Sequence, residues 1–400
     1  MHEGWSKNAV RIRFFLPWKN QINGIPGFKK QGADCSRWLL VFTDRMNEVK
    51  GMLLQLGLIF GSGLLGAFLA RAIGLPLPFL LGSLVATATL ALTLAAKTGK
   101  PLFYPKLLRE VFVGVIGTMI GTTFTTEVLA MAPTLVITLC AMMVFVVLAQ
   151  GANYTIFRFL GHYDRPTATF AAMPGGLIEA VELGERAGGD VETLSIQHFV
   201  RIVLVIITVP MLFLIFSGEA VGSAAGESLE KAPSNWQDWV LIAILAPVGL
   251  GLGRWLSVPA APLIGPLVLT AGLQATGTVD LQGPQLLLNG AQLVVGASLG
   301  ARFANSTLRR LLTALGLGMV SISVTLVIAS SLSLAIEPFV PISFQTLLIS
   351  FSPGGVTEMS LVALSLGASP VLVSTHHLFR ILFTVGVASL LTRSARNRQP

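Results

Sequence analysis

Long uncharged apolar runs separated by short polar segments are the most regular feature of this chain. A helix needs about 20 mainly apolar residues to cross the hydrocarbon core of a bilayer. Uncharged runs long enough for this cover residues 51–70, 72–96, 128–157, 255–279, 281–301 and 311–336. The pattern predicts an all-α, polytopic membrane protein and excludes an ordinary soluble domain.

Both halves of the chain predict the same order of elements. In the first half we expect spans near residues 52–71, 79–96, 111–126, 132–153 and 194–216. The second half repeats the residues of these spans at offsets of 183 and then 179: Arg71, Pro76 and Gly82 match Arg254, Pro259 and Gly265, and Gly117, Gly121 and Phe124 match Gly296, Gly300 and Phe303. The chain therefore contains one structural unit twice.

A Pro-Gly-Gly motif marks the duplication most clearly. The heptapeptide MPGGLIE at residues 173–179 returns as SPGGVTE at 352–358, and the same offset of 179 joins His198 to His377 and Arg201 to Arg380. Proline and two glycines in a row destabilise a helix. We expect a broken or re-entrant helix in each repeat, with about eight residues before the break and about twelve after it. The alternative is a surface loop followed by an amphipathic interfacial helix.

The duplication sets the boundaries expected along the chain. A first membrane repeat covers residues 51–235 and a second covers 236–392. Residues 1–50 form a basic extension that matches nothing in the second repeat, and 393–400 form a basic cytoplasmic tail. The extension lacks the apolar core of a signal peptide. It is either a disordered tail or the product of a start placed upstream of the true one, for which Met46 is a candidate.

Composition and charge support a membrane protein and fix its expected orientation. Charged residues make up only 12% of the chain against 53% hydrophobic ones, and the mean hydropathy is +0.76. The net charge of +8 does not indicate nucleic-acid binding, because 9 of the 27 Lys and Arg lie in the first 50 residues and most others flank apolar runs. Such flanking charges mark the cytoplasmic side of membrane proteins. The two cysteines, Cys35 and Cys140, predict no disulfide framework.

The positions of the basic residues favour five spans in each repeat. With five spans, the loop from Lys97 to Arg109, the cluster Arg302, Arg309 and Arg310, and both termini all lie in the cytoplasm. Six spans would place that arginine cluster outside. We therefore expect ten spans in two inverted repeats, because an odd number of spans turns the second repeat over.

Charges inside the apolar spans are the candidate functional groups. Arg201 and Arg380 lie about eight residues inside their spans, roughly 12 Å deep at 1.5 Å per residue. A charge there needs compensation, so we expect Glu179 to pair with Arg201 and Glu358 with Arg380. The pairs serve either a solute site or a purely structural tie between the broken helix and the last span. The predicted substrate- or ion-binding residues are Pro174, Gly175, Gly176, Glu179, His198 and Arg201 in the first repeat and Pro353, Gly354, Gly355, Glu358, His377 and Arg380 in the second.

Nothing in the sequence predicts an enzyme. The five histidines, His2, His162, His198, His376 and His377, lack metal-ligand spacing, and there is neither a Walker-type phosphate loop nor a nucleophile elbow. We expect no catalytic residue, no metal site and no cofactor.

The duplicated pattern of Pro-Gly-Gly, Glu, His and Arg-Ile resembles the AbrB family of bacterial membrane proteins over residues 51–392. Members are labelled as regulators of gene expression, and some carry the label ammonia monooxygenase. The resemblance implies a multi-pass protein of the bacterial inner membrane. The sequence does not support the monooxygenase label, because it shows no set of metal ligands. The two repeats differ at two aligned positions: Glu182 of the first corresponds to Leu361 of the second, and Gln197 corresponds to His376.

Two functions remain as hypotheses. Inverted repeats with broken helices and intramembrane charges favour a secondary transporter of a small polar or anionic solute, with Glu179 and Glu358 binding a coupling proton or sodium ion. The alternative is a membrane-embedded sensor that regulates gene expression indirectly. The expected partners are the lipid bilayer, the solute and further copies of the chain as a homo-oligomer, with no direct contact to nucleic acid.

Overall fold

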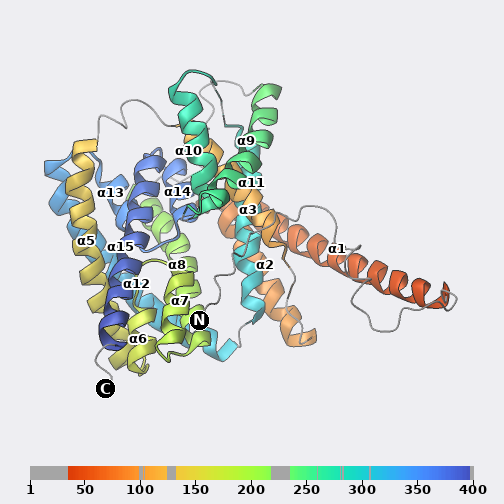
Figure 1. Ribbon diagram of the computed structural model, residues 1–400, viewed down its shortest axis with the longest axis horizontal. Helices are drawn as coiled ribbons and strands as arrows, with labels where there is room; N and C mark the ends of the chain where they lie inside the picture. Colours follow the sequence, from red (N-terminus) through yellow and green to blue (C-terminus); the bar gives the residue numbers. More distant parts are fainter. Residues whose placement is uncertain are drawn as a thin grey trace, which may run out of the picture. The chain divides into compact units, whose positions relative to one another are not determined.

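The computed structural model describes residues 35–98, 102, 104–123, 132–217, 235–258, 260–279, 281, 283–305 and 308–396, and all secondary structure in these ranges is helical (Figure 1). The chain falls into two units, Met1–Met52 and Leu53–Pro400. Helix α1 (Cys35–Ala72) crosses this boundary, so the last part of the predicted extension is continuous with the first span. The tail of 393–400 is helical as far as Arg396, where α15 ends.

Among the described residues, seven helices are long and apolar enough to cross a membrane. They contain the segments Gly51–Ala72, Pro78–Thr98, Thr134–Leu160, Val191–Ile215, Trp236–Trp255, Arg309–Phe339 and Pro370–Ala388. The three other predicted spans coincide with shorter helices: α3 (Lys106–Gly121, 16 residues), α10 (Ala261–Ala275, 15 residues) and α11 (Gln285–Ala301, 17 residues). At 1.5 Å per residue these helices are roughly 22 to 26 Å long. The end of the span expected at 111–126 lies outside the described residues.

The remaining elements follow the predicted order. In the first half they are α2 (Pro78–Thr98), α5 (Ala132–Thr155) with the π-helical turn η2 (Ile156–Leu160), α6 (Arg165–Ala171), α7 (Leu177–Arg186) and α8 (Val191–Ser217). In the second half they are α9 (Trp236–Trp255), the 3₁₀ turn η3 (Arg302–Asn305), α12 (Leu308–Ile336), the 3₁₀ turn η4 (Glu337–Phe339), α13 (Phe344–Phe351), α14 (Val356–Ser365) and α15 (Pro370–Arg396).

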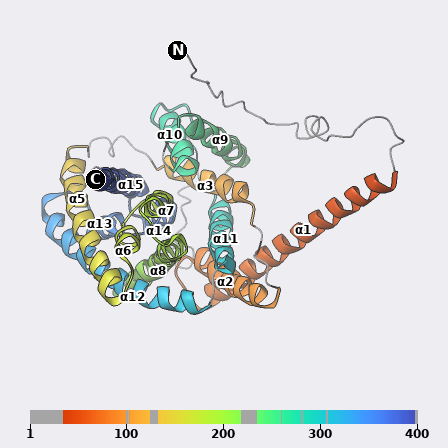
Figure 2. The same cartoon turned by 60° about the horizontal axis from the view of Figure 1, so that its bottom comes forward.

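Helices α2, α3, α9, α10 and α11 pack on one another and form what we call the crossing group. Within it, each early helix pairs with a helix of the other repeat: α2 packs on α11 and α3 on α10 (Figure 2). Glycines make both crossings close. A Cβ at Gly117 would lie 2.3 Å from the Leu263 carbonyl oxygen, and a Cβ at the matching Gly296 would lie 2.3 Å from that of Leu80. The two repeats therefore exchange equivalent contacts.

Helices α5 to α8 and α12 to α15 form the second set, the broken-helix group. Its interior is apolar around Phe145 of α5 and Phe351 of α13, whose rings stack with centroids 6.0 Å apart. Buried polar bonds join α5 to α12, because Asn153 accepts a hydrogen bond from Ser321 at 2.7 Å and donates one to Thr325 at 3.2 Å. Helix α3 packs against α14 and α15 and so connects the two groups.

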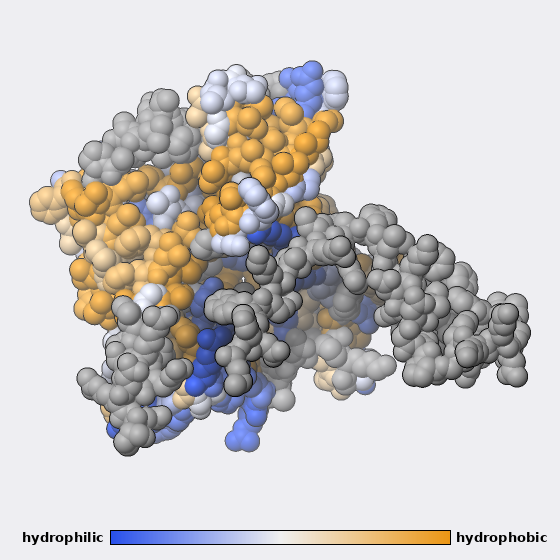
Figure 3. Space-filling model, in the orientation of Figure 1, coloured by the Kyte–Doolittle hydropathy of each residue, from blue (hydrophilic) through white to orange (hydrophobic). Residues whose placement is uncertain are grey.

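The outer surface carries apolar side chains where a membrane protein meets lipid. On α9, Val240, Ile244, Val248 and Leu252 are all exposed and lie four residues apart, along one side of the helix. Figure 3 shows broad hydrophobic areas over the α9–α10 region and on the α5 side. Contiguous exposed apolar surface of this kind is rare on proteins surrounded by water and marks contact with a membrane or a partner. They agree with the prediction of a polytopic membrane protein.

Candidate solute site at two broken helices

Each Pro-Gly-Gly motif interrupts a helix, as predicted. Helix α6 ends at Ala171 and α7 begins at Leu177, while α13 ends at Phe351 and α14 begins at Val356. The helices before the breaks have 7 and 8 residues, and both helices after them have 10. Each later helix ends before a glycine with positive φ, Gly188 at 85° and Gly367 at 65°, a common way for a helix to stop.

The breaks lie in the interior rather than in a surface loop. Pro174, Gly175 and Gly176 are buried, as are Pro353 and Gly354. Helix α14 is buried from Val356 to Leu364. Helix α7 differs, because Glu179, Glu182 and Glu185 of one face are exposed or partly exposed. The interfacial alternative thus describes only one face of α7.

The glutamate of each motif folds back over the glycine that begins its helix. A Cβ at Gly355 would lie 2.1 Å from Oε2 of Glu358, and a Cβ at Gly176 would lie 3.1 Å from Oε2 of Glu179. Each carboxylate therefore sits near the free N–H groups at the start of a helix, where negative charge is stabilised. The second glycine is needed because the glutamate takes the space that a larger residue would fill.

A histidine and an arginine of the following long helix hold each break. His198 Nε2 lies 2.9 Å from the Phe170 carbonyl oxygen, and His377 Nε2 lies 3.0 Å from that of Ile349. The Nη1 group of Arg201 donates to the Met173 carbonyl and that of Arg380 to the Ser352 carbonyl. Each bond joins residues 28 positions apart in both repeats. The duplicated sequence thus builds a duplicated anchor.

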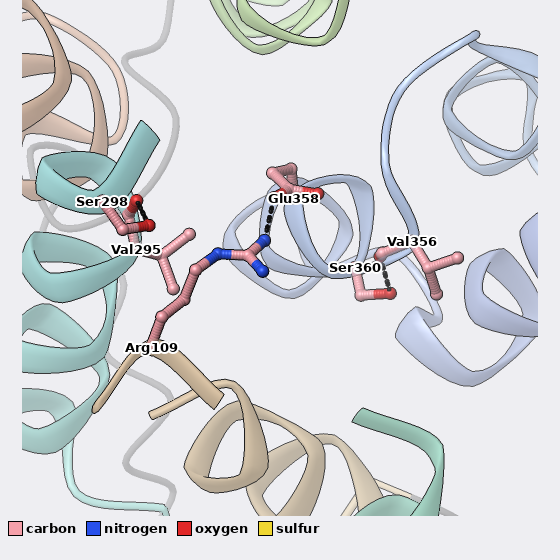
Figure 4. A network of polar contacts seen from close by, with 6 residues as sticks. All are labelled: Arg109, Val295, Ser298, Val356, Glu358 and Ser360. Atoms are coloured by element: carbon pink, nitrogen blue, oxygen red, sulfur yellow. Dashed lines mark hydrogen bonds and ion pairs between the residues drawn. The ribbon is translucent and has the colours of Figure 1, made fainter. Parts of the chain in front are cut away.

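The predicted Glu–Arg pairs are wrong. Glu358 lies 3.3 Å from Nη2 of Arg109 (Figure 4), and Glu179 is exposed. In the described part of the chain, no carboxylate lies within 4.0 Å of Arg201 or Arg380. The helix breaks explain the difference, because they free backbone carbonyls that the buried guanidinium groups bind instead.

Arg109 is the site residue that the sequence prediction missed. It was assigned to the basic loop that sets orientation, yet it lies on α3 with a side chain only 26% exposed. The position that matches it in the second repeat is Leu288, so Arg109 is not one of the charges that recur in both repeats. A second arginine, Arg302, lies near enough to Arg109 and Glu358 for its charge to act on both.

The two half-sites differ in how their polar atoms are used. Arg380 Nη2 donates to the Gly354 carbonyl at 2.6 Å and to His377 Nδ1 at 3.1 Å. That network assigns His377 as a neutral imidazole with its proton on Nε2, because Nδ1 accepts. In the first half-site, His198 Nδ1 and Arg201 Nε are both buried and have no hydrogen-bond partner among the described residues. The symmetry is therefore in the backbone anchors and not in the remaining side-chain bonds.

The two half-sites also approach each other. A Cβ at Gly175 would lie 3.4 Å from the Cα of Ile381, the residue after Arg380. Helix α7 packs on α15 and α14 on α8, so each break meets the other repeat. The breaks, the anchoring pairs and both arginines thus form one polar region inside the broken-helix group.

Comparison with known proteins identifies the family of this chain. The profile of a family described as "Transition state regulatory protein AbrB" matches residues 88–396. A protein of Escherichia coli (strain K12) named "Putative regulator AbrB" is 24% identical over 338 residues, which are 84% of this chain and 93% of that protein. "Uncharacterized protein YhjN" of Bacillus subtilis (strain 168) is 25% identical over 257 residues, 60% of this chain and 66% of that protein. Because the family profile covers most of the chain, including both motifs, this membrane protein belongs to the AbrB family.

Proposed function

We propose that the chain is a secondary transporter of a small polar or anionic solute. The observation that carries this proposal is the pair of buried helix breaks, each anchored by a His–Arg pair whose arginine has no carboxylate partner among the described residues. Broken helices of two repeats that meet inside a membrane protein are typical of transport sites. Two buried guanidinium groups beside two helix N-termini favour an anion.

The proposed arrangement in the bilayer has ten spans in two inverted repeats. Helices α3, α10 and α11 serve as short spans, of which α3 and α11 occupy corresponding positions of the two halves. Positive charge then lies on the cytoplasmic side together with both termini, in the bacterial inner membrane.

The connection between the two helix groups suggests how access to the site could alternate. Helix α3 of the crossing group meets α14 and α15 of the broken-helix group, and the Arg109–Glu358 ion pair spans this boundary (Figure 4). Movement of one group past the other would separate these two residues. Glu358, and Glu179 in the other half, are the groups proposed to take a coupling proton or sodium ion.

A membrane-embedded regulator is the second candidate. The names of the family and of the Escherichia coli relative favour it. Such a protein would bind the same solute and pass the signal to a soluble partner, without touching nucleic acid itself. Neither function assigns a catalytic role to any residue, and a homo-oligomer is compatible with both.

Reconstituted vesicles separate the two candidates. We expect a solute gradient to drive a transient current or the uptake of labelled solute into vesicles that contain the purified full chain, and not into empty vesicles. A protein that binds solute, recruits a soluble partner and gives no flux under imposed proton or sodium gradients would instead be the regulator.

A further inference from the structure

We propose that the first half-site binds the carboxylate of the solute through the Nε–Nη2 edge of Arg201, while the second half-site, at Arg380, is structural. The inference rests on the proposed function only in placing the solute at the helix breaks. It adds the chemical group that is recognised and the side chain that recognises it.

Arg201 has hydrogen-bonding capacity that the described chain does not use. Its side chain is 7% exposed, and of its nitrogens Nη1 donates to the Met173 carbonyl at the break. Its Nε is buried without a partner in the described part of the chain. A buried donor without a partner costs free energy. The Nε and Nη2 groups form a planar edge whose two parallel N–H bonds match the two oxygens of a carboxylate.

Arg380 does not offer the same edge. Its Nη1 donates to the Ser352 carbonyl, and its Nη2 donates to both the Gly354 carbonyl and His377. Within the described residues, Nε is its only nitrogen that lacks a partner. A carboxylate could not bind Arg380 by two bonds without displacing the Gly354 carbonyl that holds the break. The same contrast holds for the histidines, because His377 Nδ1 accepts from Arg380 while His198 Nδ1 meets no hydrogen-bond partner in the described ranges.

The charges of the region also favour an anion. Arg201 and Arg380 belong to half-sites that approach each other, because a Cβ at Gly175 would lie 3.4 Å from the Cα of Ile381. Glu358 is buried nearby but is committed to Arg109 (Figure 4), and Glu179 is exposed, folded back over Gly176. The region around the two arginines therefore holds more positive than negative charge. A small carboxylate would neutralise part of it and would also satisfy the Arg201 edge.

Thermal unfolding of the purified full chain tests this assignment. The probes are the sodium salts of acetate, pyruvate and succinate, compared with chloride and phosphate at equal sodium concentration and ionic strength. We expect at least one carboxylate to raise the melting temperature above its value in chloride and phosphate, because a ligand that binds only the folded state stabilises it. No shift with any of the three carboxylates, or a larger shift with phosphate, would overturn the proposal.

Matched substitutions locate the effect. Arg201→Lys keeps the charge but removes the planar edge, and we expect the carboxylate affinity to fall about ten- to a hundredfold, the equivalent of one charged hydrogen bond. Arg380→Lys is the comparison at the matching position, and there we expect a smaller fall in carboxylate affinity than at Arg201. Equal losses in both variants would contradict an asymmetric site.

Chemical modification of the wild-type protein tests the assignment without any substitution, so it also applies if a variant does not fold. Phenylglyoxal reacts with accessible guanidinium groups, and mass spectrometry of the peptides identifies the modified arginine. We expect Arg201 to be modified and to be protected by the carboxylate that raised the melting temperature, while Arg380 stays unmodified. An unreactive Arg201, or protection at Arg380, contradicts the assignment. If a carboxylate binds but is not transported, the proposed transport function is overturned and the Arg201 assignment stands. If the carboxylate is transported and Arg201→Lys leaves the flux unchanged, the Arg201 assignment is overturned and the transport function stands.

Discussion

The buried arginines of the two half-sites donate hydrogen bonds to carbonyls that the local backbone supplies. The expectation that each buried arginine needs a carboxylate follows from the cost of an isolated charge. It fails for Arg201 and Arg380 because a proline and two glycines leave carbonyls without helical partners directly beside them. Glu358 is then free to reach a different element, where it binds Arg109.

The Arg109–Glu358 pair makes a prediction at the level of single residues. Arg109→Leu introduces the residue found at the matching position 288 and removes the ion-pair partner of Glu358, whose side chain is only 5% exposed. We expect it to lower the free energy of unfolding more than the double change Arg109→Leu with Glu358→Gln does. The double-mutant cycle, followed by denaturant titration in mixed micelles, should give a coupling free energy of about 1 to 3 kcal/mol. Glu179→Gln is the control and should change stability by less than about 0.5 kcal/mol. Additive effects at 109 and 358 would show that the pair contributes nothing.

Gly355 gives a second prediction, because its missing side chain leaves room for Glu358. In Gly355→Ala the new methyl group would meet Oε2 of Glu358 at 2.1 Å, so the carboxylate must move away from Arg109. We expect lower thermal stability, and no further loss when Arg109→Leu is added, because both changes break the same contact. Gly386→Ala on α15 meets no atom within 4 Å and should be neutral or stabilising by up to about 1 kcal/mol. Wild-type stability of Gly355→Ala would mean that Glu358 does not occupy this space.

The sequence was sufficient for the anchors of the site but not for its asymmetry. His198, Arg201, His377 and Arg380 could be predicted because each recurs at a fixed offset inside an apolar run. Arg109 could not, because a charge that occurs in one repeat only is indistinguishable in sequence from an orientation signal. Which nitrogen of each arginine is used depends on tertiary distances that residue spacing does not encode.

At the scale of helices, the close crossings between the repeats carry the architecture. We predict that Gly117→Ala and Gly296→Ala destabilise the protein by similar amounts, about 1 to 3 kcal/mol each, since either new Cβ would lie 2.3 Å from a backbone oxygen that cannot rotate away. Gly290→Ala on α11 is the control, because a Cβ there meets no atom within 4 Å. The melting temperatures of the three variants in one detergent provide the comparison. A tolerated Gly117 or Gly296 substitution would contradict the crossing.

Helix types were easier to predict than helix lengths. Uncharged apolar runs identified four of the seven long helices in the described part of the chain, and the expected order of spans in the two repeats covered the other three. The Pro-Gly-Gly motifs identified both breaks, because period and backbone chemistry are local properties. The uncharged run at 255–279 contains only the 15 residues of α10, however, since α9 extends to Trp255 and the turn between the two helices includes Ala260 with a positive φ of 50°. Hydrophobicity alone does not show where an apolar run turns.

At the scale of the whole molecule, the ten-span arrangement predicts which segments face each side of the membrane. In a variant whose native cysteines are serines, a cysteine at Ser228, between α8 and α9, should react with an impermeant maleimide added to intact cells. A cysteine at Leu308, beside Arg309, should react only after the cells are opened, because the arginine cluster is expected in the cytoplasm. Labelling at Leu308 from outside would exclude the ten-span arrangement.

The exchange of partners between repeats has a consequence for how the protein is made. Helix α2 must find α11, and α3 must find α10, each about 150 to 200 positions further along the chain at a synthesis rate of about 5 to 20 residues per second. The first half therefore waits in the bilayer for roughly ten seconds or more with its glycine-lined faces open. During that time another nascent copy could supply the missing helices, so slow translation of the second half should favour intertwined dimers.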